Sequence, residues 1–237
     1  AVTDSTLVLG CAKADDGSYE NYAVGNVYWC KVWYKDLGEE ACKKLVCWTH
    51  ENITMEVCGF KKYYLSDNPS KRCSFTLLAK HLLSRNMTYN SSYDYGNQGG
   101  WKESALNTFL NTRLYNAIPV QIKSLIKRVT VASSIGRRSS EIATSECYVY
   151  VPSVIEMTNE SQYNKEPYIN EAPYTISYMT SNEARKRSYD GGDYGWYWLR
   201  SPSVEYDSYI FCVNNEGEMY GYCLAPNEYG VLIEVSF

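Results

Sequence analysis

The C-terminal part of the chain has the most regular pattern of apolar and polar positions. From residue 196 onward, short apolar segments alternate with clusters of Tyr, Asp, Asn, Ser and Gly, and the last apolar run occupies residues 230–235. Short β-branched and aromatic runs separated by turn residues are typical of antiparallel strands. The pattern therefore predicts a β-rich region that begins near Trp196.

Two amphipathic helices are predicted in the middle of the chain, one over residues 103–116 and one that begins at Pro119. Their apolar positions recur at helical spacing and comprise Leu106, Phe109, Leu110 and Leu114 in the first helix and Ile122, Leu125, Ile126 and Val129 in the second. Proline suits the first helical position, because an N–H there has no intrahelical partner. The short connection between the two helices favours their being neighbours in space.

Shorter segments complete the pattern. Residues 53–58 and 147–151 are rich in β-branched and other apolar residues and predict strands. Residues 153–160 suggest a short helix, whereas residues 89–100 and 161–180 are rich in turn residues and predict ordered loops. The mixture of helices and antiparallel strands predicts an α+β fold.

The N-terminal part has the features of a separate, β-rich segment. Residues 7–34 predict short strands, and Asp36 followed by Glu39 forms a capping box for one helix. We therefore divide the chain into residues 1–70, a small β-rich segment with one helix, and residues 71–237, a larger ligand-binding domain.

Tyrosine is strongly over-represented, with 24 Tyr against 5 Phe. A Tyr side chain has an apolar body and a hydroxyl that needs a partner or water, so surplus Tyr favours surfaces and interfaces. Tyr combined with Ser, Gly and Asn is also the composition of antibody paratopes, where Tyr gives contact area at low entropic cost. The C-terminal clusters of these residues therefore predict a binding surface.

The bulk composition argues against several functional classes. Hydrophobic residues make up 45% and charged residues 21% of the chain, which is typical of a globular protein. The net charge of -4 argues against nucleic-acid binding, which normally needs a basic surface. No apolar run is long enough to span a bilayer, so we expect no membrane insertion.

The sequence shows no catalytic or metal-binding spacing. Its 9 Cys are an odd number without a C-x-x-C pair, which favours reduced, buried thiols over a disulfide framework or a zinc site. The two His, His50 and His81, lie in no zinc-ligand pattern, and the sequence has neither G-x-S-x-G nor a phosphate-binding loop. We therefore expect no enzyme activity, no catalytic residue, no metal and no cofactor.

Three motifs follow one another along the chain. The first is Trp101-Lys102-Glu103-Ser104 with Leu106-Asn107 and Phe109-Leu110-Asn111, the second is Tyr115-Asn116-Ala117 with Pro119, and the third is Trp198-Leu199-Arg200-Ser201-Pro202. Together they resemble a domain family of gut bacteria and their phages, over residues 74–237. That family is similar to the C-type-lectin-like fold, and some members are the variable proteins of diversity-generating retroelements.

The resemblance implies a C-type-lectin-like fold, with two helices packed on a small twisted antiparallel sheet and long ordered loops. It implies a receptor-binding function in adhesion, at a phage tail fibre or on a bacterial cell surface, with a host-surface protein or glycan as the receptor. Assembly into a homotrimer stays open. The family's closing G-V-R-P-A-L is replaced here by Gly230-Val231-Leu232-Ile233-Glu234-Val235.

The resemblance also implies which residues contact the ligand. In these retroelements template adenines are miscopied, so an Asn codon yields Tyr, Asp, Ser, Asn, Gly, Phe or Cys but not Glu, Met, Trp, Lys or Gln. The residues admissible as diversified positions by this rule are Tyr206, Asp207, Ser208, Tyr209, Asn214, Asn215, Tyr220, Tyr222, Asn227 and Tyr229. Together with Tyr194 and Trp196 they are the candidate ligand-binding residues. Trp198, Arg200 and Pro202 are assigned to the scaffold, where the guanidinium fork of Arg200 is expected to tie several carbonyls together.

Two alternatives stay open on the same fold. A formylglycine-generating type of enzyme would use paired cysteines, for which Cys212 and Cys223 are the candidates. A calcium-dependent carbohydrate-binding lectin would need a cage of oxygen ligands. Acids such as Glu205 and Asp207 supply carboxylates, but the Glu-Pro-Asn and Trp-Asn-Asp lectin signatures are absent from the sequence.

The N-terminal segment resembles the final strands and short helix of a laminin-G or concanavalin-like domain. The resemblance is carried by Leu9-Gly10, Gly25-Asn26-Val27, Val32-Trp33-Tyr34, Leu37 and Glu40. It implies that the chain begins within the tail of an upstream module.

Overall fold

The computed structural model describes residues 11–13, 19–21, 47–48, 51–189 and 192–237. The described strands are β1 (Cys11–Lys13), β2 (Tyr19–Asn21), β3 (Cys47–Trp48), β4 (Glu51–Asn52), β5 (Met55–Phe60), β6 (Phe75–Ala79), β7 (Met87–Thr88), β8 (Val129–Ser134), β9 (Ile142–Cys147), β10 (Val149–Tyr150), β11 (Tyr197–Pro202), β12 (Tyr209–Val213), β13 (Met219–Leu224), β14 (Glu228–Tyr229) and β15 (Glu234–Ser236). They form several small antiparallel sheets, and short helices lie among them, so the α+β class predicted from the sequence is confirmed.

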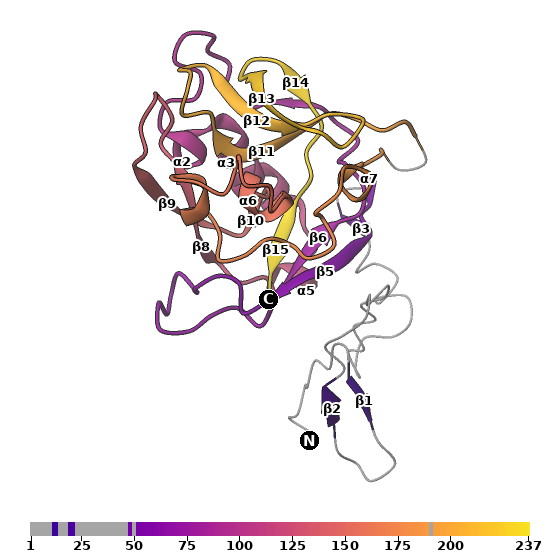
Figure 1. Ribbon diagram of the computed structural model, residues 1–237. Coiled ribbons are helices and arrows are strands. Elements are labelled where there is room, and N and C mark those ends of the chain that lie inside the picture. Colours follow the sequence, from indigo (N-terminus) through magenta and orange to yellow (C-terminus); the bar gives the residue numbers. More distant parts are fainter. Residues whose placement is uncertain (1–10, 14–18, 22–46, 49–50, 190–191) are drawn as a thin grey trace.

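The two largest sheets have four and three strands. The four-stranded sheet has the order β10-β15-β6-β5, and the three-stranded sheet has the order β11-β12-β13. The two sheets lie toward opposite ends of the molecule in Figure 1, with α2 (Gly100–Glu103), α3 (Ala105–Phe109) and α6 (Val154–Met157) between them. The second sheet, together with the loops that connect its strands, carries most of the candidate residues.

The four-stranded sheet includes a strand from each side of the expected domain boundary. β5 precedes residue 70, yet Val57 pairs with Leu77 of β6, which in turn pairs with Val235 of β15. Every residue of β6 is buried, as expected of an apolar strand in the interior of a sheet. The sheet therefore crosses the boundary that the sequence suggested near residue 70.

The first predicted helix is present over nearly its predicted range, and a separate helical turn precedes it. Helical structure covers α2, then α3, the π-helical turn η1 (Leu110–Leu114) and α4 (Tyr115–Ala117). Ser104 has extended backbone between α2 and α3, and its hydroxyl accepts a hydrogen bond from the Asn107 N–H at 3.0 Å. Ser104 is therefore the N-cap of the predicted helix, which begins at Ala105 and continues to Ala117, and the short α2 before it was not predicted. The apolar face is confirmed, because Leu106, Leu110 and Leu114 are buried.

The second predicted helix is shorter than its apolar spacing indicated. It comprises only α5 (Val120–Lys123), and Pro119 caps it instead of occupying the first helical position. Ile122 and Ile126 are buried as expected, but Val129 starts β8 and pairs with Cys147 of β9. Pairing with a distant strand thus overrides the local helical periodicity at Val129.

Most of the shorter elements are of the type, helix, strand or loop, that the sequence predicted. The strand predicted over residues 53–58 appears as β5, and the one over residues 147–151 as the end of β9 with β10. Residues 153–160 contain α6, and residues 161–180 have no regular structure except the 3-10 turn η2 (Tyr168–Asn170). A further short helix, α7 (Asn182–Arg185), was not predicted.

Of the N-terminal predictions, only short strands fall within the described residues. β1 and β2 pair antiparallel, with Ala12 opposite Glu20. The helix predicted from Asp36 and the residues that carry the resemblance to a laminin-G domain lie outside the described residues.

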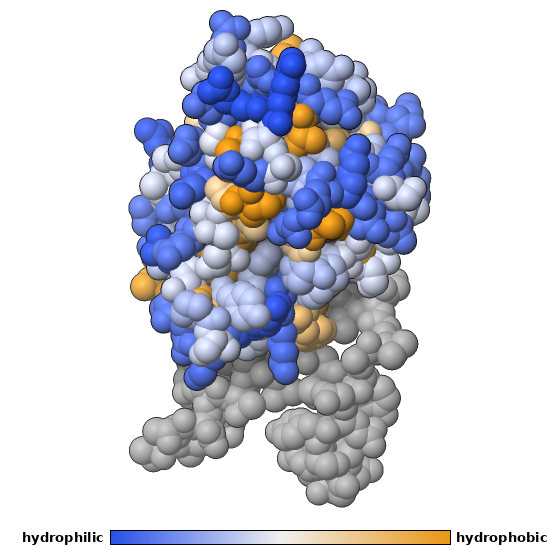
Figure 2. Space-filling model, turned by 60° about the vertical axis from the view of Figure 1, so that its left-hand side comes forward, coloured by the Kyte–Doolittle hydropathy of each residue, from blue (hydrophilic) through white to orange (hydrophobic). Residues whose placement is uncertain are grey.

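The surface is mostly hydrophilic on the side drawn in Figure 2, where apolar residues form small patches separated by polar ones. In the described part of the chain, no helix combines the length and the apolar character needed to cross a membrane.

Candidate binding face

Six aromatic side chains from β11–β14 and their loops lie in ring-to-ring contact, and we name them the aromatic strip. Its members are Trp196, Tyr206, Tyr209, Tyr220, Tyr222 and Tyr229. The centroids of neighbouring rings are 5.4–5.7 Å apart, within the range of favourable aromatic pairs. All six were candidate ligand-binding residues, so the structure brings half of the predicted set into one continuous surface.

The strip is open to solvent along β13, which is an edge strand of the three-stranded sheet. Tyr220 and Tyr222 are the two exposed residues of this strand, whereas Cys223 is buried. Tyr206, Tyr220 and Tyr222 are 41%, 43% and 48% exposed, whereas Cys223 is 1% exposed. The hydroxyls of Tyr209 and Tyr220 make no hydrogen bond to another described residue, so these two Tyr present both a ring and a free polar group.

The inner end of the strip rests on the core. Trp196 stacks on Tyr229, and the Tyr229 ring also lies 4.8 Å from the ring of Trp198. Trp198 is fully buried, and its indole N–H donates to the Met87 carbonyl at 2.7 Å. The predicted scaffold role of Trp198 thus corresponds to a buried ring that fixes the base of the strip.

A disulfide joins Cys212 of β12 and Cys223 of β13 on the buried face of the three-stranded sheet. The sequence favoured reduced thiols, and the structure corrects this for these two residues because their Cα atoms are 6.3 Å apart on adjacent strands. Cys58, Cys73 and Cys147 are free and buried. The buried disulfide thus links β12, which carries Tyr209, to β13, which carries Tyr220 and Tyr222.

Asn97 holds the loop between β11 and β12 in place. Its buried side-chain amide donates to the carbonyls of Ser203 at 3.1 Å, Tyr206 at 2.6 Å and Tyr209 at 3.0 Å. Its Oδ1 accepts the Arg137 N–H at 2.9 Å. The sequence pattern placed Asn97 in a loop and indicated no role for it, because its partners lie far away in the sequence.

Other predicted ligand-binding residues lie around the strip. Asp207 pairs with the Arg138 side chain at 3.1 Å, and the Asn227 side chain donates to the Tyr229 hydroxyl at 3.2 Å. Ser208 is half-buried and Asn215 is exposed in the β12–β13 turn. These four residues border the rings or the adjacent turn without forming part of the ring contacts.

Two predicted ligand-binding residues, Asn214 and Tyr194, are not part of the strip. The Asn214 side chain is used inside the β12–β13 turn, where its Oδ1 accepts the N–H groups of Glu216 at 2.9 Å and Glu218 at 2.8 Å. Asn214 therefore shapes the turn instead of facing solvent. Tyr194 is exposed but makes no ring contact with another described residue, and its ring lies under the ammonium of Lys186.

Arg200 is the buried centre of the scaffold. Its guanidinium donates to the carbonyls of Ala132 at 2.9 Å, Val151 at 2.9 Å and Glu171 at 2.8 Å. It also pairs with the Glu156 carboxylate and donates to the Tyr63 hydroxyl at 2.9 Å. The sequence predicted that Arg200 would tie several carbonyls together, and this is what its side chain does. Pro202, the third scaffold residue, ends β11 opposite Ile210.

Further charged groups surround Arg200 in the core. Lys62 pairs with Glu156 and, at 3.1 Å, with Glu234, and all three side chains are fully buried. Although burial opposes it, the charges of Arg200 and Lys62 lower the pKa of Glu156 to about 2. Burial and the charge of Glu156 raise the pKa of Glu234 to about 7. Glu156 is therefore the carboxylate that neutralises both cations.

Glu171 is a second buried acid beside this cluster. Burial raises the pKa of Glu171 to about 7, against the opposing hydrogen bonds from Ser201 and from the Ser134 N–H at 2.9 Å. Buried acids with shifted pKa values are candidates for catalysis. These acids are 0–1% exposed, so no substrate reaches them in this conformation, and we interpret the cluster as structural.

Few signals in the sequence indicate this cluster. Lys62 and Glu156 have unremarkable neighbours in the sequence. Glu234 interrupts the closing apolar run, and a charge in such a strand is the one signal that could have indicated a buried ion pair.

Residues of the first motif position the helix against the sheets. Trp101 is fully buried, and its indole N–H points to the Cys147 sulfur at 3.4 Å. Asn111 accepts the Tyr148 N–H at 2.7 Å and donates to the Val149 carbonyl at 2.8 Å, which joins the helix to β10. These two residues of the first motif thus serve packing.

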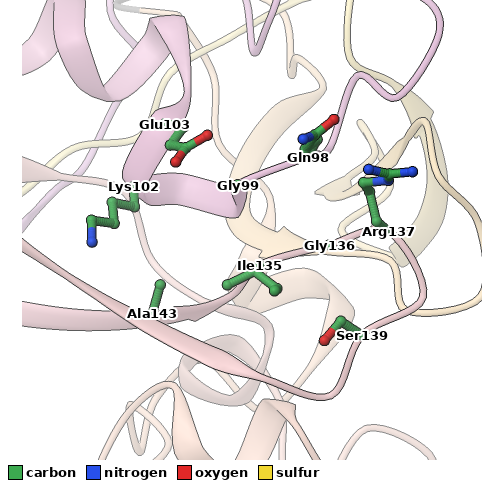
Figure 3. A pocket seen from close by; sticks show the side chains of 9 residues that line it. All are labelled: Gln98, Gly99, Lys102, Glu103, Ile135, Gly136, Arg137, Ser139 and Ala143. Atoms are coloured by element: carbon green, nitrogen blue, oxygen red, sulfur yellow. The ribbon is translucent and has the colours of Figure 1, made fainter.

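An open cavity of about 560 Å³ lies beside α2 and the β8–β9 hairpin. Its lining residues are Gln98, Gly99, Lys102, Glu103, Ile135, Gly136, Arg137, Ser139 and Ala143. Figure 3 shows Lys102 and Glu103 extending from α2, with Gln98 and Arg137 toward the other end of the cavity. The cavity and the strip share one support, because Asn97 bonds to Arg137 on one side and to Tyr206 on the other.

In the described residues, no group of three or more His, Cys, Asp or Glu is arranged to hold a metal ion.

These features define an α+β domain with an exposed aromatic face on a small braced sheet. The chain belongs to the family described as "Domain of unknown function (DUF6273)", which it matches over residues 74–232. Neither a curated protein nor a solved structure matches the chain.

Proposed function

We propose that this domain is a C-type-lectin-like ligand-binding module that mediates adhesion. The observation that carries the proposal is the aromatic strip, whose exposed rings lie on the edge strand β13 and in the β11–β12 loop. The other two strands of the sheet are almost entirely buried, and a disulfide links β12 to β13. Rigid aromatic side chains with polar neighbours give large contact area at low entropic cost. A few of them suffice to supply most of the binding energy of an interface.

The proposal extends to the variable proteins of diversity-generating retroelements. Five of the six strip residues are Tyr, which adenine miscopying of an Asn codon produces, whereas the residues that brace the sheet from below include Trp198 and Arg200. Exchange of the outer residues would alter the ligand and leave the inner framework unchanged. We place such a protein at a phage tail fibre or on a bacterial cell surface, with a host-surface protein or glycan as its receptor.

A genomic observation tests the retroelement origin. We expect a near-copy of the DNA for residues 190–230 close to a reverse-transcriptase gene, with differences confined to adenines of the template. A copy that differs at all four bases alike, or a locus without such a copy, contradicts this origin and leaves the binding function to be judged separately.

A display library tests the binding function without knowledge of the natural ligand. The domain is displayed on yeast with Tyr206, Asp207, Tyr209, Tyr220 and Tyr222 randomised, and the library is selected against an arbitrary folded protein. We expect most members to reach the surface and specific binders to emerge.

Two control libraries give the comparison. Randomising Phe60 and Tyr64, which are 53% and 45% exposed elsewhere on the molecule, should preserve display but give no binders. Randomising Trp198, Leu199 and Ile210, which are fully buried, should abolish display. We call the first library, which is randomised at the exposed positions, the strip library. If its display level fell to that of the second control, the strip would be part of the core and the proposal would be refuted.

A further inference from the structure

We infer that the aromatic strip binds a positively charged segment of a partner protein, one that presents Arg or Lys side chains. This inference rests on the proposed binding function and names the chemistry of the partner. It draws on the charges around the strip, on their position relative to the rings, and on the pairing of the cations nearby.

The segment that carries the strip has acidic side chains on its surface and no basic ones. Six acids between residues 192 and 237 are at least partly exposed: Asp193, Glu205, Asp207, Glu216, Glu218 and Glu228. The one basic residue in this segment is Arg200, which is fully buried. The surface around the rings therefore has an excess of negative charge, although the whole chain has a net charge of only -4.

Two of these acids lie beside exposed rings. Glu218 directly precedes β13 and is exposed, as are Tyr220 and Tyr222 within that strand. The Asn214 side chain donates to the Glu218 carboxylate at 2.9 Å and holds the charge at the end of the strip. The neighbouring Tyr206 and then the charge of Glu205 raise the pKa of the Tyr222 hydroxyl, which places Glu205 within electrostatic range of that ring.

The cations near this face already have partners. Arg138 pairs with Asp207 at 3.1 Å, and Lys186 pairs with Glu183 at 2.7 Å. The Arg137 guanidinium lies 4.6 Å from the ring centroid of Tyr95. No described cation lies over the rings of Tyr206, Tyr220 or Tyr222, so these rings and the Glu205 and Glu218 carboxylates stay open to a cation from outside.

Aromatic faces and carboxylates together favour cationic groups. The face of a Tyr ring is negative and attracts an ammonium or guanidinium, and Arg also stacks flat on such rings. An adjacent carboxylate adds a charge-assisted hydrogen bond to the same group. The Lys186 ammonium, 5.7 Å from the Tyr194 centroid, shows the same combination of cation and ring within the protein itself. An acidic partner would instead meet like charges on this face.

Three fluorescent peptides of equal length test the inference on the full chain. They carry Arg, Gln or Glu at every second position between Gly and Ser residues, and binding is followed by fluorescence polarisation at low and physiological salt. We expect the Arg peptide to bind, the Gln peptide to bind more weakly and the Glu peptide not to bind. Affinity for the Arg peptide should fall with added salt, because exposed charges are screened.

Matched variants separate the rings from general electrostatic attraction. The double variant Tyr220→Ala/Tyr222→Ala should weaken binding of the Arg peptide by about two- to fivefold per ring. The pair Glu205→Gln/Glu218→Gln should weaken it by a similar factor, since the new amide at position 218 keeps an oxygen that accepts from Asn214. The control pair Asp67→Asn/Glu146→Gln removes the same charge from exposed positions outside the three-stranded sheet and should leave binding within about twofold.

The outcomes are distinct. Loss of binding in both strip variants but not in the control pair supports the inference. Equal binding of all three peptides, preference for the Glu peptide, or equal weakening by the control pair overturns it. Specific binders from the strip library together with no binding of the Arg peptide would reject the cationic partner and keep the proposed function. Failure of that library would reject both.

Discussion

The side-chain amide of Asn97 donates to the backbone carbonyl of Tyr206 at 2.6 Å, across more than a hundred residues of sequence. The same amide also reaches the carbonyls of Ser203 and Tyr209, so one buried residue sets the path of the loop that presents two rings of the aromatic strip. Binding surfaces keep their shape when residues below them lock the backbone. The position of Tyr206 is therefore determined from below, by Asn97, as well as by the rings around it.

We predict that Asn97→Ala destabilises the protein by about 2–3 kcal/mol, because the carbonyls of Ser203 and Tyr206 lose the donor, and the Arg137 N–H loses the acceptor, that Asn97 provides. Urea unfolding followed by circular dichroism measures the change. Asn215→Ala, in the exposed β12–β13 turn, is the matched control and should change stability by less than about 0.5 kcal/mol. Equal effects of the two replacements would show that the hydrogen bonds of Asn97 do not hold the loop.

Gly136→Ala should destabilise the domain because the added methyl group would press against the backbone of Asn97. Gly136 has a φ of 70°, and an added Cβ would lie 2.1 Å from the Asn97 carbonyl oxygen. Strain of this kind costs about 1–3 kcal/mol. Gly192→Ala is the control, since its Cβ would meet nothing closer than 3.6 Å. Urea unfolding measures the free energy of unfolding of both variants. A Gly136→Ala variant as stable as the Gly192→Ala variant would contradict the prediction.

Arg200→Lys should be strongly destabilising although it keeps the charge. An ammonium cannot reach the three carbonyls, the Glu156 carboxylate and the Tyr63 hydroxyl that the planar guanidinium contacts. Breaking a buried pair of this kind costs about 3–5 kcal/mol.

Arg138→Lys provides the control for this replacement. Its pair with Asp207 is largely exposed, so the change in unfolding free energy should stay below about 0.5 kcal/mol. A tolerated Arg200→Lys, with a thermal midpoint close to that of the original protein, would remove Arg200 from the centre of the scaffold.

The buried acids predict a pH dependence of stability. The pKa of Glu171 is raised to about 7 in the folded state. A carboxyl with a raised folded pKa stabilises the protein below its unfolded pKa, and this contribution is lost as the pH rises toward 7. Stability should therefore decline between about pH 4.5 and pH 7 through Glu171, and through Glu234, whose pKa is also raised to about 7.

Glu171→Gln isolates one of these two groups. The neutral amide cannot ionise, so the variant should show a smaller decline in unfolding free energy over that pH range, with the part due to Glu234 retained. Urea unfolding at several pH values measures both slopes. Identical slopes in the two proteins would mean that Glu171 does not titrate in this range.

Local patterns were sufficient for the elements and for part of the candidate face. The apolar spacing of Leu106, Leu110 and Leu114 predicted a buried helical face, and the clusters around Tyr220 and Tyr222 predicted an exposed aromatic surface. Both predictions depend on side chains that are close in sequence, which is the information that a periodic pattern contains.

Contacts between distant segments were not predictable in this way. Val129 continued a helical spacing but joined β8, because its partner Cys147 lies in another part of the chain. Lys62, Glu156 and Asn97 carry no sequence signal of their own, since their roles depend on groups that only folding brings together. Asn214 resembled a ligand-binding residue by composition alone, yet its side chain closes the turn beside it.

The disulfide on the inner side of β12 and β13 has an evolutionary consequence. Cys223 is covalently fixed to Cys212, while the next residue toward the N-terminus, Tyr222, faces outward. A mutation at Tyr222 therefore changes a side chain on a backbone that the neighbouring disulfide already holds in place. A lineage that replaces Tyr222 by such single steps need not pass through an ancestor that fails to fold.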